Sequence, residues 1–299
     1  MLNTTYLIWM GASALAAGIV HYFLTGSLKK RGVLTALTLV LGMVLGALFA
    51  RLGYCLLQFD YAMGYGFMET LVSDDMSLMS YYSGMLGVIL GAMLAAKCTG
   101  NRVMPALNAY APAGALLASL ARFGEHFLDM ICAGNYVEDE TLCFFPYAVS
   151  NEWDEWYVAV HLFAGLFYFI IFLVSLLKFR EKRFLRTLFY LCLVQVFCES
   201  LRNQSLIWTQ FVRVEQLLCM VAVEVILVLL GVWTKGEKKR FLPAVTGLVC
   251  AGIFVAVEFA VGGKLFEGTP IPVFYGVMIA GLAVLALWEI WLMRRQPKA

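Results

Sequence analysis

Long apolar segments separated by short polar connections dominate the hydrophobic pattern of the chain. Crossing the hydrocarbon core of a bilayer takes about 20 mostly apolar residues, and nine windows reach that length. The windows cover residues 5–24, 33–58, 77–96, 103–123, 156–177, 184–203, 214–233, 241–262 and 273–293. The pattern predicts an all-α polytopic membrane protein of about nine transmembrane helices. The first window is too long, and too weakly basic ahead of it, for a cleavable signal peptide.

The composition supports this interpretation. Of the 299 residues, 62% are hydrophobic and 14% are charged, and the mean hydropathy is +0.81. Soluble domains carry far more charge and less apolar sequence. The nine windows leave almost no residues for a soluble domain. We find no nucleotide-binding loop, cofactor motif or metal-ligand spacing. We therefore expect no cofactor, no metal and no nucleic-acid partner.

The basic residues predict the orientation of the chain. Seventeen of the 22 Lys and Arg residues lie in the connections that follow the odd-numbered windows. Because basic connections stay on the cytoplasmic side, we expect the N-terminus outside and the C-terminus in the cytoplasm. The connections on the other side, residues 60–76 and 131–155, are rich in carboxylates and aromatic residues. We expect a multi-pass plasma-membrane protein whose polar site faces the extracytoplasmic side.

Two further features bear on packing. Gly42 and Gly46 in the second window, and Ser80, Gly84, Gly87 and Gly91 in the third, recur at helix-contact spacing. Small residues at this spacing let helix backbones approach closely in membranes, so we expect a tight bundle. The loop at 131–155 is expected to form a structured cap, in which Cys132 and Cys143 could pair if the outside is oxidising.

Ionisable residues gather where several windows reach the outer side. The stretch "LLASLARFGEHFLDM" at 116–130 ends the fourth window with four of them. The residues concerned are Arg51 in the second window, Tyr81 and Tyr82 in the third, Arg122 in the fourth with Glu125, His126 and Asp129 directly after it, and Gln195, Glu199 and Arg202 in the sixth. A charge within a bilayer costs about 2.5–3.5 kcal/mol. Such groups therefore usually face a cavity or a partner.

Their spacing indicates polar stripes on helices. Glu125 and His126 follow Arg122 by three and four residues, so both can lie beside it on one helical face. Gln195, Glu199 and Arg202 are spaced to share a face in the same way. Guanidinium groups suit the phosphate of a phospholipid, because the planar fork gives bidentate contacts and stays charged. A neighbouring carboxylate or imidazole could remove a proton from a nucleophile.

Structural alternatives exist for each of these residues. Arg122 and Arg202 lie near helix ends and could extend to the outer headgroups. Arg51 could form a structural ion pair with a glutamate. His126 could be a hydrogen-bonded structural histidine.

Four sequence elements resemble those of a known family, in the same order, between residues 40 and 205. They are "LGALFARLGY", "MSYYSGMLGVILG", "LARFGEHF" and "VFCESLRNQ", and together they resemble the prolipoprotein diacylglyceryl transferases. That family transfers a diacylglyceryl group from phosphatidylglycerol to the lipobox cysteine thiol of a lipoprotein precursor and releases glycerol phosphate. The resemblance implies a phospholipid, in particular phosphatidylglycerol, and a lipoprotein precursor peptide as partners at the membrane.

The resemblance also implies roles for individual residues. Arg51 and Arg122 match arginines of the family, and Glu199 and Arg202 match its late glutamate and arginine. The departures are Tyr82 in place of a histidine, Ser83 in place of a glycine, Glu125 in place of an asparagine and Gln195 in place of an arginine. The resemblance thus implies phospholipid binding by Arg51, Arg122, Arg202 and Gln195, and catalytic roles for Tyr82, Glu125, His126 and Glu199. His126 or Glu125 would replace the missing base.

The sequence leaves the function open between classes. We expect a transferase-like transmembrane domain at residues 1–240 and an additional pair of transmembrane helices at residues 241–299. A noncatalytic protein on the same fold, binding phospholipid or a protein partner, is the main alternative. A transporter is a third, although the sequence shows none of the repeat symmetry or broken helices typical of that class.

Overall fold

A computed structural model gives the fold of the protein. The structure describes residues 4–73, 75, 78–128, 134–151, 153–203, 207–209, 212–234, 239–261 and 270–296. The chain forms two compact units. The first comprises Met1–Leu191 with Leu201–Leu206, and the second comprises Cys192–Ser200 with Ile207–Ala299. The predicted division at residues 240 and 241 stays a prediction.

Nine long helices coincide with the nine predicted windows. They are α1 (Thr4–Leu24), α2 (Arg31–Leu57), α5 (Tyr81–Cys98), α6 (Val103–Gly124), α7 (Val160–Leu177), α8 (Arg183–Ser200), α9 (Val214–Trp233), α10 (Leu242–Val261) and α11 (Ile271–Arg295). Among the described residues, eight of these helices are long and apolar enough to cross a membrane. The other is α8, which carries Arg183, Arg186 and Glu199. The prediction of an all-α polytopic membrane protein is confirmed, while the orientation of its termini stays a prediction.

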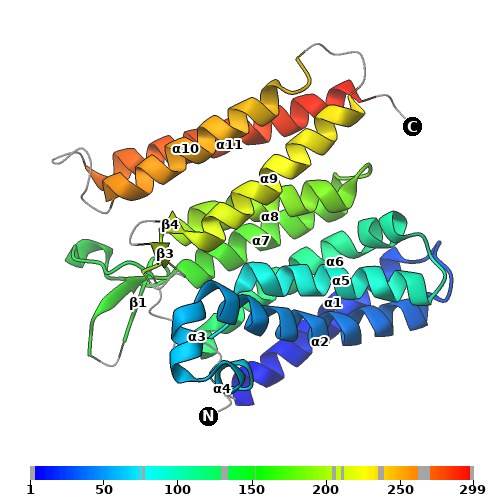
Figure 1. The fold of residues 1–299 in the computed structure, drawn as a ribbon, viewed down its shortest axis with the longest axis horizontal. Helices are drawn as coiled ribbons and strands as arrows, with labels where there is room; N and C mark the ends of the chain where they lie inside the picture. The colour runs from blue at the N-terminus through cyan, green and yellow to red at the C-terminus, as the bar shows by residue number, and fades with distance from the viewer. Residues whose placement is uncertain are drawn as a thin grey trace. The chain divides into compact units, whose positions relative to one another are not determined.

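The first unit is built around closely packed helices α1, α2, α5, α6 and α7 (Figure 1). The predicted glycine seam joins α2 to α5. A Cβ added to Gly87 would lie 2.2 Å from the carbonyl oxygen of Leu45, and one added to Gly91 would lie 2.6 Å from the amide nitrogen of Gly42. These distances are far below van der Waals contact, so only glycine permits this approach of the two backbones. The predicted close packing is confirmed here.

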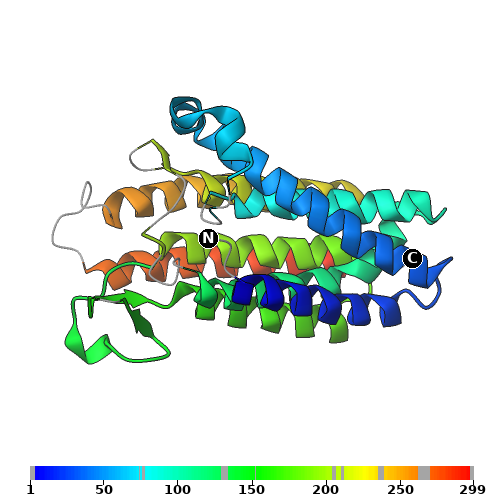
Figure 2. The same cartoon turned by 90° about the horizontal axis from the view of Figure 1, so that it is seen from below.

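Short elements cover one end of the first unit. Helices α3 (Phe59–Tyr65) and α4 (Phe67–Leu71) lie beyond the end of α2 (Figure 2). Strands β1 (Ala148–Ser150) and β2 (Trp156–Val158) form an antiparallel hairpin. Regular structure in the described part of the 131–155 loop confirms the expectation of a structured cap there.

Carboxylates stabilise the turns of this cap. The Glu155 carboxylate accepts hydrogen bonds from Asn151 Nδ2 at 2.7 Å and the Tyr157 hydroxyl at 2.8 Å. Asp139 accepts from the Thr141 hydroxyl at 2.7 Å and caps the 3-10 turn η3 (Glu140–Leu142) by accepting from the Thr141 amide at 2.9 Å. Because these bonds favour the charged form, they hold the pKa of both carboxyl groups below the usual range. Cys132 lies outside the described residues, so its pairing with Cys143 stays a prediction.

The second unit contains α9, α10 and α11, with α10 packed against both of the others (Figure 1). Strands β3 (Ile207–Thr209) and β4 (Val212–Arg213) form a short antiparallel pair immediately before α9. Among its buried residues are large apolar side chains such as Phe254 and Met278, together with polar ones such as Glu258. The C-terminal half of α8 belongs to this unit.

Candidate functional site in the first unit

The start of α5 is fixed against the end of α2. The Ser80 amide donates to the Ala50 carbonyl at 3.0 Å, and the Ser80 hydroxyl caps α5 by accepting from the Ser83 amide at 3.3 Å. A Cβ on Gly53 would lie 2.1 Å from the Ser83 hydroxyl oxygen, so this corner is tightly packed. As a result, Tyr81 stands at a defined position in the first turn of α5.

Arg122 lies against this tyrosine. It is a buried residue of the last turn of α6, and its guanidinium carbon lies 3.9 Å from the centroid of the Tyr81 ring. Tyr168 of α7 stacks on Tyr81 with ring centroids 6.2 Å apart. A cation over an aromatic face is attracted by the negative charge of that face. The two tyrosines therefore hold the guanidinium in one orientation.

The end of α6 is positioned by α1. The Trp9 indole donates to the Leu120 carbonyl at 2.7 Å. A Cβ on Gly124 would lie 2.6 Å from a Trp9 ring carbon, so the ring packs directly on the glycine. These contacts explain why a glycine stands between Arg122 and Glu125 in this helix end.

Glu125 links two arginines. It begins the 3-10 turn η1 (Glu125–Phe127), where it pairs with Arg122 and accepts from Arg202 Nη2 at 3.3 Å. The Arg122, Arg202 and Glu125 side chains are only 3%, 9% and 14% exposed, so the contacts form in a poorly hydrated environment. The predicted contact between Arg122 and Glu125 is confirmed. That between Arg202 and Glu125 joins residues 77 positions apart, which spacing could not predict.

Arg202 does not share a helical face with Gln195 and Glu199, and that expectation is wrong. Helix α8 ends at Ser200, and Arg202 forms an isolated antiparallel bridge with Gly134. Gln195 and Glu199 remain on α8 in the second unit, where both are buried and Gln195 Nε2 donates to the Glu199 carboxylate at 3.1 Å. The helix ends because the chain turns to pair with the loop before β1.

Arg51 fixes the connection between α4 and α5. Its guanidinium donates to the carbonyl oxygens of Leu78 at 3.0 Å, Ser73 at 2.8 Å and Asp75 at 2.5 Å. From the sequence, we expected Arg51 to bind lipid or to pair with a glutamate. Its contacts with backbone carbonyl oxygens were not predicted. Arg51 follows Ala50, whose carbonyl oxygen accepts from the Ser80 amide, and Arg122 lies over the ring of Tyr81, the next residue. The two arginines thus reach two sides of the same corner.

Two histidines extend the cluster. His126 is exposed, and its ring stacks on that of His161 with centroids 5.8 Å apart and planes 29° apart. His161 is buried at the start of α7, and among the described residues its Nε2 has no hydrogen-bond partner. His161 was not among the candidate residues predicted from the sequence. Its position beside a long polar loop was the available signal.

The remaining predicted residues are less defined. Tyr82 lies in the first turn of α5 and is partly buried, and its proposed role stays a prediction. Asp129 lies outside the described residues. Among the residues that the structure describes, no group of three His, Cys, Asp or Glu side chains is placed to hold a metal ion. The expected absence of metal and cofactor remains a prediction.

This arrangement has the composition of an anion site with a proton acceptor nearby. Arg122, Arg202 and Glu125 carry two positive charges and one negative, and an exposed imidazole follows Glu125 directly. Arginines held by a carboxylate and an aromatic ring are oriented before any ligand arrives. Such a site can hold a phosphate group and exchange a proton with a nearby nucleophile.

Comparison with known proteins identifies the family. No curated protein matches the chain. The model of the family described as prolipoprotein diacylglyceryl transferase matches residues 2–233, which include every candidate residue of the site and exclude α10 and α11. This family acts in the membrane on a lipid and a lipoprotein precursor, and its activity is of the transferase type. The chain belongs to the prolipoprotein diacylglyceryl transferase family.

Proposed function

We propose that this protein transfers the diacylglyceryl group of phosphatidylglycerol to the cysteine thiol of a lipoprotein precursor at the outer leaflet of the plasma membrane. The observation that carries the proposal is the convergence of two buried guanidiniums, Arg122 and Arg202, on Glu125. Membership of the family supplies the class of reaction.

The arginines would bind the phosphate of the lipid. Arg122 is oriented by Tyr81 and Glu125, so little reorganisation is needed when a phosphate arrives. Donors oriented in advance in a poorly hydrated site stabilise developing negative charge far better than water does. Arg51 would shape the same corner through the carbonyls at 73–78, and Tyr82 would orient the headgroup.

The reaction itself needs a proton acceptor. A thiol has a pKa of about 8.5, so only a few per cent is thiolate at neutral pH. His126 or Glu125 would take the thiol proton. The sulfur would then bond to the glyceryl carbon that carries the phosphate ester, and the carbon–oxygen bond would break to release glycerol phosphate. Arg122 and Arg202 would stabilise the charge on the departing phosphate.

Glu199 and Gln195 enter the proposal through the resemblance. We assign Glu199 to orienting the reacting groups and Gln195, which donates to its carboxylate, to supporting it.

A noncatalytic phospholipid- or partner-binding role is the second candidate. Two observations favour it: Tyr82 replaces the histidine of the family pattern, and the Glu125 carboxylate already accepts from both arginines. In this case the cluster would recognise a phospholipid headgroup or a partner without transferring the lipid.

Label transfer tests the proposal directly. Purified protein is incubated with phosphatidylglycerol labelled in its acyl chains and with a lipobox peptide. The proposed function predicts label on the peptide, and a peptide with serine in place of the cysteine should remain unlabelled. Retention of labelled lipid on the protein without transfer would support the second candidate. Neither transfer nor retention would refute both.

A further inference from the structure

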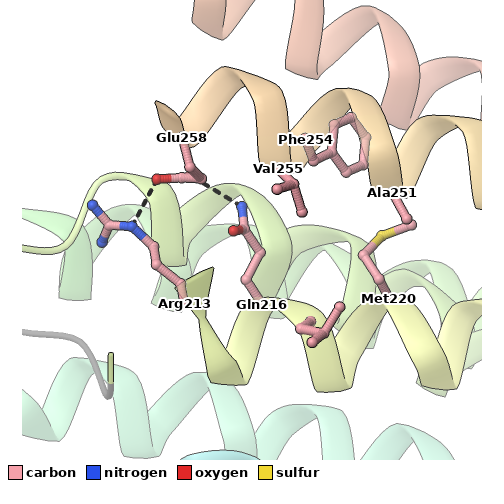
Figure 3. Close-up of a pocket in the computed structure, with 8 residues that line it drawn as sticks. Arg213, Gln216, Met220, Ala251, Phe254, Val255 and Glu258 are labelled. Atoms are coloured by element: carbon pink, nitrogen blue, oxygen red, sulfur yellow. Dashed lines mark hydrogen bonds and ion pairs between the residues drawn. The ribbon is translucent and has the colours of Figure 1, made fainter. Parts of the chain in front are cut away.

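A second buried polar cluster joins three helices of the second unit. Arg213 Nε donates to Glu258 Oε2 at 2.8 Å, and Gln216 Nε2 donates to Glu258 Oε1 at 3.1 Å. Figure 3 shows Arg213, at the end of β4, and Gln216 of α9 directed toward the Glu258 carboxylate of α10. We call Arg213, Gln216 and Glu258 the α8 clamp, because two of them also contact the end of α8.

The clamp holds the end of α8. Arg213 Nη1 donates to the Glu199 carbonyl oxygen at 2.7 Å, and Gln216 Nε2 also donates to the Val196 carbonyl oxygen at 3.2 Å. The last four carbonyls of a helix have no partner within the helix and need one outside it. Arg213 supplies that partner for the residue that carries the Glu199 side chain. The clamp thus fixes the backbone from which this carboxylate projects.

The clamp is closed to large ligands. The Arg213 and Glu258 side chains are 15% and 5% exposed, and each is the other's ion-pair partner. The adjoining cavity has a volume of about 10 Å³ and is lined mainly by apolar residues such as Met220 and Phe254. A cavity of roughly that volume holds about one water molecule. The cavity cannot admit a lipid headgroup. We therefore look for the role of the clamp in its contacts with α8.

We propose that the α8 clamp is a positioning device for Glu199, and that α10 takes part in it by supplying Glu258. The inference rests on the proposed function, since it gives Glu199 a part in the reaction. Glu258 lies beyond residue 233, where the match to the family ends. The C-terminal helices are therefore more than a membrane anchor, because one of them contributes the anion that orients Arg213.

Substitution of Glu258 tests the clamp through kinetics. Glu258→Gln keeps the shape of the side chain and removes its charge, so Arg213 should lose its fixed orientation. We expect kcat for lipid transfer to fall about tenfold with KM changed less than about twofold, since a small misplacement of a reacting group can cost up to about 100-fold. Glu224→Gln is the matched control, because Glu224 lies on α9 outside the clamp, and it should transfer lipid as the wild type does.

A conservative substitution separates positioning from stability. Arg213→Gln should lower kcat as Glu258→Gln does, while Arg213→Lys, which keeps the positive charge and a donor for the Glu199 carbonyl, should lose less. A loss that follows the thermal unfolding temperature of each variant, with no change in the kcat of the folded protein, would overturn the proposal.

Hydrogen exchange keeps the inference testable if the wild type transfers no lipid. Failure of transfer by the wild type would refute the proposed function and would say nothing about the contacts with α8. In Glu258→Gln, the amides of residues 196–200 should then exchange faster than in wild type, with the helices of the first unit unchanged. Equal exchange at these amides in wild type, Glu258→Gln and Glu224→Gln would refute the clamp.

Discussion

The protein has two buried arginine–glutamate clusters that differ in the number of arginines paired with the glutamate and in their surroundings. In the first unit, Arg122 and Arg202 share the carboxylate of Glu125, and the next residue, His126, is exposed. In the second unit, Arg213 pairs with Glu258 beside a cavity with room for about one water molecule. The first combination suits exchange with a ligand, whereas the second suits a permanent contact.

The difference shows why residue type alone does not identify a site. A buried ion pair is weak evidence for stability or function by itself, because the cost of removing both charges from water offsets their attraction. Surroundings decide the use. An exposed imidazole beside the first cluster is available as a proton acceptor in the proposed reaction, while the second cluster contacts backbone carbonyl oxygens of α8.

The largest expected effect is in the first cluster. Arg122→Lys should lower kcat/KM for lipid transfer about 100-fold, because an ammonium cannot reproduce the planar contacts with Glu125 and the Tyr81 ring. The measurement is label transfer by protein of verified thermal stability. Arg180→Lys, on an exposed connection, should keep full activity. Full activity of Arg122→Lys would contradict the assignment of the first cluster as the reactive one.

A somewhat smaller effect is expected for the base. General bases typically contribute about 100-fold or more, so His126→Gln should lower kcat by about 100-fold or somewhat less if Glu125 takes over in part. His21→Gln is the control histidine, since His21 is buried against Tyr110 in α1 and α6. It should change stability and not the kcat of folded protein. Unchanged activity of His126→Gln would remove its proposed role.

Glycine substitutions compare the scaffolds of the two clusters. Gly87→Ala places a Cβ 2.2 Å from the Leu45 backbone oxygen, whereas Gly247→Ala in α10 meets the end of the flexible Glu224 side chain. Overpacking against backbone typically costs about 1–3 kcal/mol. We therefore expect thermal unfolding of Gly87→Ala in detergent to occur at a lower temperature and that of Gly247→Ala to stay near wild type. Equal destabilisation of both variants would argue against a special seam at α2 and α5.

The smallest effect concerns the cap beside the first cluster. Hydrogen bonds lower the pKa of Asp139 and Glu155 in the folded state. Their stabilising contribution is therefore complete above the unfolded-state pKa of about 4 and is lost as the pH falls through the lower folded values. Proteolysis of the 134–159 segment should accelerate slightly in this acidic range, measured with an acid-active protease. Glu155→Gln should remove part of the pH dependence, whereas Glu138→Gln should retain it.

Much of the scaffold follows from local sequence. All nine long helices were predicted, because a bilayer requires each crossing to be apolar and to satisfy its backbone hydrogen bonds internally. The glycine seam followed from spacing on a helix, as did the contact between Arg122 and Glu125 three residues apart. In each case the feature depends on residues that lie close together in one helix or recur at regular spacing along it.

Contacts between distant residues were decided by the tertiary structure. Glu125 meets Arg202 across 77 positions and Arg213 meets Glu258 across 45, and no periodicity relates residues so far apart. The sequence likewise did not show that α8 stops at Ser200, that Tyr81 lies against Arg122, or that His161 stacks on His126. The sequence determined which segments are helices in a membrane, through length and apolarity. Only packing decided which charged groups meet, because that depends on the positions of several helix ends at once.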